Sequence, residues 1–126
     1  MILCANPSEQ FKSYQLEIEN AAISVMRSNR FILGKEVEEL EQEFADYIGS
    51  NHAIGVANGT DAIELALRAL DIGIGDEVIT VSHTAVATVA AIECTGAKPV
   101  LVDIDPKSYT LNPLQLEECF TKKTKA

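Results

Sequence analysis

Three short apolar runs separated by helical stretches constrain the fold of this chain more than any other feature. The runs are AIGVA at 53–57, EVITV at 77–81 and PVLVD at 99–103. A helical pattern at about 60–70 follows the first run, and an unusually apolar stretch at 84–96 follows the second. Uniformly apolar strands that alternate with helices are typical of a parallel sheet buried on both faces. The sequence therefore predicts an α/β fold with three parallel strands.

Helical patterns also precede this α/β body. Apolar side chains repeat at three- and four-residue steps from about residue 8 to 28, and again in KEVEELEQEFADYI at 35–48. The loop at 29–35 is the one stretch that looks like a boundary between subdomains. We therefore expect a helical arm at 1–34, followed at 35–126 by the first part of a larger α/β domain.

The end of the sequence supports the expectation of an incomplete domain. A short final helix is predicted in LQLEECF, and TKKTKA follows where a further strand would be expected. A parallel sheet of three strands with bare edges is poorly protected against pairing with other chains.

Charge and apolar patterning argue against several classes of protein. The net charge of −9, from 10 basic and 19 acidic residues, disfavours nucleic-acid binding, since the one basic cluster is Lys122, Lys123 and Lys125. No apolar stretch is long enough to span a bilayer, and the first residues do not read as a secretory signal. The three widely spaced cysteines fit free thiols in a reducing cytoplasm.

The stretch NGTD at 58–61 is the first candidate site. A strand that enters a helix through small residues presents free N–H groups, and the helix dipole adds partial positive charge there. Gly59 permits close approach of a ligand and a positive φ, and Thr60 offers a hydroxyl that could cap the helix or donate to a phosphate oxygen. Asp61 would have to contribute through its amide while its carboxylate turns away. On these residues alone a plain helix start is the better-supported interpretation, because short glycine turns are common.

His83, in VSHTAVAT at 81–88, is the second candidate. It follows a predicted strand, at the edge where open α/β sheets bind ligands. Its imidazole could stack on a ring or hydrogen-bond to it; the alternative is a histidine packed at a helix start, with Ser82 or Thr84 as the N-cap. A lone histidine without an identified partner favours that alternative.

No metal site is expected. Asp103 and Asp105 form a DxD pattern, but Asp105-Pro106 is a good turn starter and no further ligand stands at EF-hand spacing. His52 has no histidine or cysteine companion nearby. Glu64 and Arg68, four residues apart on a predicted helix, are expected to form a surface ion pair.

Taken in order, the segments resemble the amino-terminal part of the DegT/DnrJ/EryC1/StrS family of pyridoxal-phosphate-dependent sugar aminotransferases. The segments that carry the resemblance are RFILGKEVEELEQEFADYIG, HAIGVANGTDAIELALRAL, GDEVITVSHTAVATVAAI, GAKPVLVDIDPKSYTLNP and TKKTKA. The resemblance implies the large domain of a fold-type-I aminotransferase and a homodimer with shared active sites.

The resemblance also assigns roles to the candidate residues. It implies that Gly59, Thr60 and Asp61 hold the phosphate of pyridoxal 5′-phosphate (PLP), mainly through backbone amides and the Thr60 hydroxyl. It implies that the loop at His83 lies over the pyridine ring. Many family members carry a bulky aromatic two residues after the histidine position, where this chain has Ala85. Either His83 supplies the stacking plane, or the ring is held from elsewhere.

No catalytic residue is expected in this chain. PLP-dependent transamination needs a lysine amine for the Schiff base and a carboxylate beside the pyridine nitrogen. In the family both lie beyond the segment equivalent to residue 126. None of the lysines here stands in the family's Schiff-base context; they are Lys12, Lys35, Lys98, Lys107, Lys122, Lys123 and Lys125.

The resulting hypothesis is the amino-terminal segment of a cytoplasmic aminotransferase that moves an amino group, typically from glutamate, onto a keto sugar nucleotide. The segment alone is expected to be inactive. Three alternatives stay open. One is a non-catalytic module, either a truncated product or a subunit that completes a partner chain. The second is an α/β protein that binds phosphate or a nucleotide without PLP chemistry. The third is a purely structural fragment, which neither PLP nor phosphate would stabilise.

Overall fold

The computed structural model describes residues 4–126, which divide into two compact units. One unit extends to Gly55 and the other is Val56–Ala126. The predicted boundary between a helical arm and the α/β domain, at 34/35, lies inside the first unit and stays a prediction.

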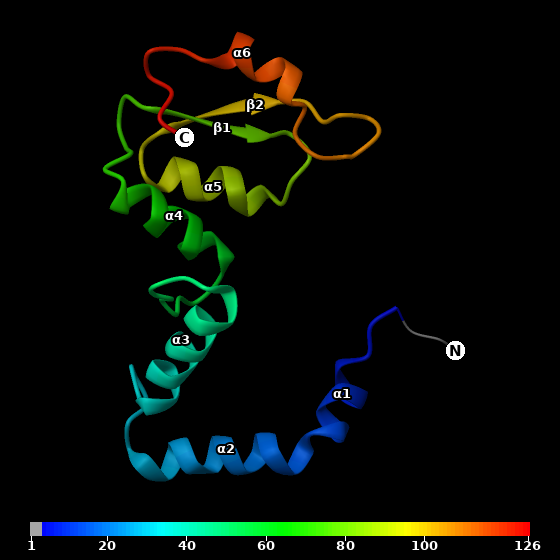
Figure 1. Cartoon of the computed structure of the whole chain (residues 1–126), viewed down its shortest axis with the longest axis vertical. Coiled ribbons are helices and arrows are strands. Elements are labelled where there is room, and N and C mark those ends of the chain that lie inside the picture. Colours follow the sequence, from blue (N-terminus) through cyan, green and yellow to red (C-terminus); the bar gives the residue numbers. More distant parts are fainter. Residues whose placement is uncertain (1–3) are drawn as a thin grey trace. The chain divides into compact units, whose positions relative to one another are not determined.

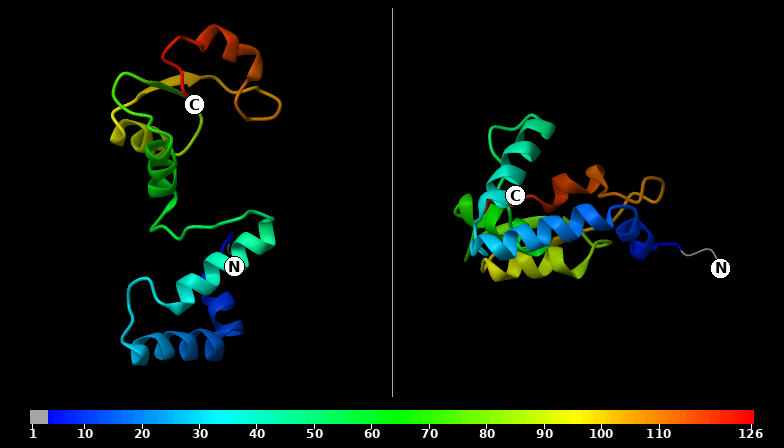
Figure 2. Two further views of the ribbon diagram at one scale, coloured as in Figure 1. Left: turned by 60° about the vertical axis from the view of Figure 1, so that its left-hand side comes forward. Right: turned by 90° about the horizontal axis from the view of Figure 1, so that it is seen from below.

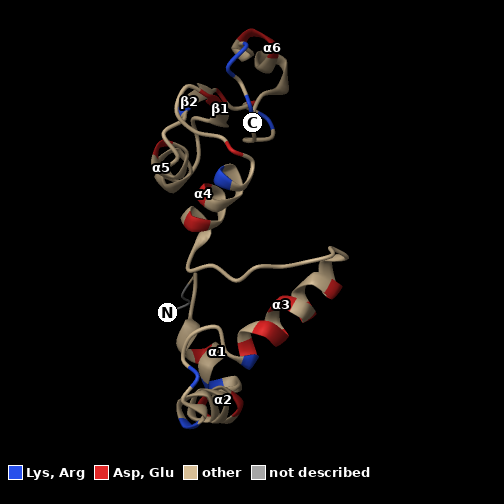
Figure 3. Cartoon of the chain, turned by 90° about the vertical axis from the view of Figure 1, so that its left-hand side faces the viewer, with Lys and Arg blue, Asp and Glu red and all other residues tan. Residues whose placement is uncertain are grey.

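The first unit consists of three helices, α1 (Pro7–Ser13), α2 (Gln15–Ser28) and α3 (Lys35–Ile48) (Figure 1). The helical pattern predicted from about 8 to 28 is confirmed, but it forms two helices rather than one, because Tyr14 leaves the helical conformation with φ −122° and ψ 18°. Helix α3 has the predicted bounds and ends at Gly49, whose φ of 73° is a left-handed conformation that glycine adopts without strain. Acidic residues recur along α3 (Figure 3), as expected of a helix with a solvated surface.

The strand predicted at 53–57 does not form. Ile54 is 80% exposed, and the N–H of Gly55 donates to the side-chain Oε1 of Glu41 at 2.7 Å. The hydrogen bonds that define a β-strand are made to the backbone of a neighbouring strand. Within residues 4–126 no strand lies beside these residues, so their apolar pattern alone does not produce a strand.

The second unit is built around a parallel pair of strands. Its elements are α4 (Gly59–Ala69), β1 (Glu77–Val81), α5 (Val86–Cys94), β2 (Lys98–Val102), a 3₁₀ turn η1 (Pro113–Gln115) and α6 (Leu116–Cys119). In the register Glu77 lies opposite Lys98, and Val81 lies opposite Val102. Helices α4 and α5 run against the strand direction, so both helices begin on the side where the strands end (Figure 1). The predicted α/β architecture is confirmed. The sheet has two strands, however, rather than the three that were predicted.

The last residues of the chain pair with the free edge of β1 (Figures 1 and 2). The N–H of Glu77 donates to the carbonyl oxygen of Lys123 at 2.8 Å, and the N–H of Lys125 donates to the carbonyl oxygen of Glu77 at 2.9 Å. The N–H of Ile79 donates to the carbonyl oxygen of Ala126 at 2.9 Å. Strand β1 is therefore hydrogen-bonded on both edges, by β2 and by the segment where a further strand was expected.

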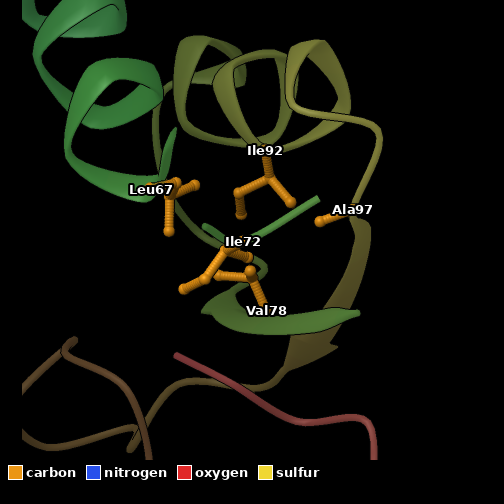
Figure 4. Close-up of a cluster of buried hydrophobic side chains, with 5 residues drawn as sticks. All are labelled: Leu67, Ile72, Val78, Ile92 and Ala97. Atoms are coloured by element: carbon orange, nitrogen blue, oxygen red, sulfur yellow. The ribbon is translucent and has the colours of Figure 1, made fainter. Parts of the chain in front are cut away.

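A small apolar core lies between the helices and β1. Its members come from α4, α5, β1 and the loops that precede β1 and β2, and are Leu67, Ile72, Val78, Ile92 and Ala97 (Figure 4). Ile92, only 1% exposed, is the largest fully buried side chain. The described helices include none that is both long and apolar enough to cross a membrane.

Glu77 is a buried carboxylate at the start of β1, only 8% exposed. The Thr121 hydroxyl donates to its Oε2 at 2.6 Å, and the Lys98 ammonium lies 3.5 Å from its Oε1. The hydrogen bond from Thr121 is the main reason that the pKa of Glu77 lies below its usual value; burial opposes this shift and Lys98 supports it. The carboxylate thus ties the segment after α6 to the sheet.

We predict that Glu77→Gln flattens the dependence of stability on pH. A lowered pKa in the folded state stabilises the fold above the unfolded-state pKa of about 4.3, and this stabilisation is lost as the pH falls through the folded-state pKa. Urea unfolding from pH 7 to pH 3 should show a steeper loss of unfolding free energy for wild type than for Glu77→Gln. The exposed Glu118→Gln is the control and should retain the wild-type slope. Equal slopes for wild type and Glu77→Gln would contradict the prediction.

Candidate functional site

The start of α4 is organised by Asn58. This residue is extended, with φ −163° and ψ 176°, and its Oδ1 accepts the N–H of Asp61 at 3.0 Å. Its Nδ2 donates to Oδ2 of Asp61 at 3.1 Å. Asn58 is therefore the N-cap, the role that the sequence had suggested for Thr60. The preference of asparagine for a position just before a helix was the available signal.

Two backbone amides remain available at this helix start. Within residues 4–126 the N–H groups of Gly59 and Thr60 have no acceptor, and the hydroxyl of the half-buried Thr60 has no partner. The amide of Asp61, expected to be a third donor to a ligand, is bound to Asn58. Free N–H groups at the positive end of a helix dipole attract anions.

Gly59 is open on its outer side. It does not use the positive φ that glycine permits, and a Cβ built on it would meet no atom within 4 Å. The chain's own packing therefore gives no reason for glycine here. The lack of a side chain leaves the two amides accessible to a ligand.

His83 lies in the exposed loop between β1 and α5. The prediction that Ser82 or Thr84 caps α5 is wrong: the N-cap is Ala85, and it makes no side-chain hydrogen bond to the helix. The N–H of Ser82 instead donates to the carbonyl oxygen of Val102 at 2.8 Å, which extends the pairing of the two strands by one residue. The strand pattern predicted the end of β1 at Val81 but not this additional hydrogen bond from Ser82.

The two candidate segments lie at the same end of the second unit. Because α4 and α5 both run against the strands, the turn at 58–61 and the loop at 82–85 are both at the carboxyl end of the strands (Figure 1). No hydrogen bond joins the two segments among the described residues. Ligands of open α/β sheets bind at this end.

The other candidate residues have structural roles. Oδ1 of Asp105 accepts the N–H groups of Lys107 and Ser108 at 2.7 and 3.1 Å, which confirms the predicted turn. Arg68 and Glu64 form the predicted ion pair, with Nε and Oε1 2.8 Å apart. The part of the chain that the structure describes contains no cluster of three or more potential metal ligands.

Comparison with known proteins identifies the family. A profile of the DegT/DnrJ/EryC1/StrS aminotransferase family matches residues 12–126. The chain belongs to this family. The resemblance inferred from the sequence segments is thereby confirmed.

Individual family members agree over most of this chain. It is 50% identical over 113 residues, 90% of its length, to the dTDP-3-amino-3,6-dideoxy-alpha-D-galactopyranose transaminase of Aneurinibacillus thermoaerophilus. A crystal structure of S. venezuelae DesV in complex with a ketimine intermediate matches 95% of the chain at 42% identity, with a TM-score of 0.92. The chain spans 31% and 32% of these two relatives, about a third of their length.

The comparisons also bear on the cofactor. Structures of Spr1654 from Streptococcus pneumoniae in a PLP-form and a pyridoxamine 5′-phosphate (PMP) form match 82% of this chain at 35% identity, with a TM-score of 0.79. The chain covers 26% of Spr1654. The cofactor implied for the family is therefore pyridoxal 5′-phosphate. The fold is that of part of a PLP aminotransferase.

We predict that Asn58→Ala lowers the free energy of unfolding by about 1 kcal/mol, because the helix loses its N-cap. Asn58→Ser should retain most of the wild-type stability, since a serine hydroxyl can also accept the N–H of Asp61. Urea unfolding monitored by circular dichroism measures both variants. Equal stability of Asn58→Ala and wild type would show that Asn58 does not cap α4.

Proposed function

We propose that residues 1–126 are the cofactor-phosphate segment of a PLP-dependent aminotransferase that transfers an amino group from glutamate to a keto sugar nucleotide. The observation that carries this proposal is the pair of open amides at Gly59 and Thr60, at the start of α4, in a chain of this family. The sugar-nucleotide substrate is supported by the name of the transaminase from A. thermoaerophilus.

The helix start suits a phosphate dianion. The amides of Gly59 and Thr60 would each donate one hydrogen bond, and the Thr60 hydroxyl would donate a third. The dipole of α4, an 11-residue helix, adds partial positive charge at the same place. In this proposal Asp61 shapes the turn without adding its charge to the site.

The loop after β1 is proposed to cover the cofactor ring. With Ala85 in place of the family's frequent aromatic, His83 is the side chain of this loop that can offer a flat face. When bound, the cofactor supplies an electron sink for the amino-transfer chemistry. The lysine and the pyridinium carboxylate that this chemistry requires are proposed to lie outside residues 1–126, so no catalytic residue is proposed within them.

A homodimer is part of the proposal. In the described part of the chain, Ala45 of α3 is the one buried hydrophobic residue of helices α1, α2 and α3. Their large apolar side chains are mostly exposed, including Ile18, Leu40 and Phe44 at 46%, 59% and 51%. Amphipathic helices with uncovered apolar faces are typical of association surfaces.

We predict that the chain binds pyridoxamine 5′-phosphate (PMP) more tightly than pyridoxamine, which lacks the phosphate. PMP is fluorescent and has no aldehyde that could react with surface lysines, so a fluorescence titration reports reversible binding. Thr60→Val should weaken PMP binding about tenfold, because a hydrogen bond to a charged group is lost, and should leave pyridoxamine binding unchanged. Thr110→Val, in the exposed loop after β2, is the matched control.

The titration separates the proposal from its alternatives. Equal affinity for PMP and pyridoxamine would contradict the phosphate site. Equal affinity for PMP and inorganic phosphate would instead favour a phosphate-binding module without PLP chemistry.

A further inference from the structure

We infer that Asn58 is a positioning residue of the phosphate site, which holds the negative charge of Asp61 away from the open amides. The inference rests on the proposed function. It concerns a residue that contributes no hydrogen bond to the phosphate itself. Its basis is that one side chain binds both the backbone and the carboxylate of Asp61.

The need for such a residue follows from the position of Asp61. Its carboxylate belongs to the first turn of α4, where a negative side chain is favoured by the same dipole that favours a phosphate. An unrestrained aspartate there can fold toward free N–H groups and compete for them. A carboxylate left near a phosphate dianion would also repel it. The first turn therefore binds phosphate well only if the Asp61 carboxylate is held away from the free amides of Gly59 and Thr60.

Two hydrogen bonds join the Asn58 side chain to Asp61. Its Oδ1 accepts the N–H of Asp61 at 3.0 Å, and its Nδ2 donates to the carboxylate at 3.1 Å. The two contacts fix the orientation of the amide, since a flipped group would place a donor against the N–H and an acceptor against the carboxylate. The carboxylate is thereby bound to the capping side chain, and Gly59 and Thr60 keep free amides.

Asparagine is particularly suited to this task among the good N-cap residues. Serine, threonine and aspartate can accept the N–H of Asp61, but an ionised aspartate has no donor, and a hydroxyl has a single hydrogen on the atom that also accepts. Asparagine carries an acceptor and a donor on separate atoms. Asn58→Ser therefore keeps the cap and weakens the restraint on the carboxylate, because a single hydroxyl oxygen would have to serve both contacts.

A double-mutant cycle tests the inference. The affinity for PMP is measured by fluorescence titration for wild type, Asn58→Ser, Asp61→Ala and the double variant, and urea unfolding confirms that each is folded. Asn58→Ser should weaken PMP binding about fivefold when Asp61 is present, through repulsion by the released carboxylate. In the Asp61→Ala background the same substitution should have almost no effect, because no carboxylate remains to be restrained.

The outcomes are distinct. Equal weakening by Asn58→Ser in both backgrounds would mean that Asn58 acts only as a helix cap, and no weakening in either would mean that it does not act on the site; both results overturn the inference. If wild type does not prefer PMP over pyridoxamine, the proposed function fails, and this inference fails with it. A preference for PMP without coupling between residues 58 and 61 overturns the inference alone.

Discussion

The parallel pairing of β1 with β2 is the constraint on which the rest of the second unit depends. Two adjacent parallel strands cannot be joined by a tight turn, so the chain must return along the sheet through α5. That return path buries Ile92 against Val78 and sets the loop at 82–85 at the carboxyl end of the strands. Glu77 supports the pairing at the opposite end, where its backbone and side chain bind residues 121–125.

The sequence pattern correctly predicted elements whose start, end and buried face are encoded in their own residues. Helix α3 carries its own apolar stripe and its own stop at Gly49, and β1 was predicted residue for residue. The strand expected at 53–57 was wrong, because strand formation depends on a partner that sequence periodicity does not supply. The break at Tyr14 interrupts a helical pattern that has no glycine or proline at that position.

In the candidate site, too, the local sequence pattern located the turn but did not predict the contacts between its side chains. The turn at 58–61 could be located from its residues, but the physics of a helix start fits a plain cap as well as a ligand site. Asn58 was not recognised as the cap, although asparagine before a helical pattern is a sufficient signal. The hydrogen bond that occupies the amide of Asp61 depends on side-chain geometry and could not be predicted from spacing. Membership of the aminotransferase family then favours a phosphate ligand over a plain cap.

In the proposed site Gly59 and Thr60 hold a phosphate while the amide of Asp61 stays bound to Asn58. A ¹H–¹⁵N correlation spectrum recorded during titration with PMP, and separately with pyridoxamine, tests this most directly. PMP should move the amide resonances of Gly59 and Thr60 most, and pyridoxamine should leave them in place. The Asp61 amide should stay protected from hydrogen exchange throughout. Unchanged resonances at Gly59 and Thr60 with saturating PMP would contradict the claim.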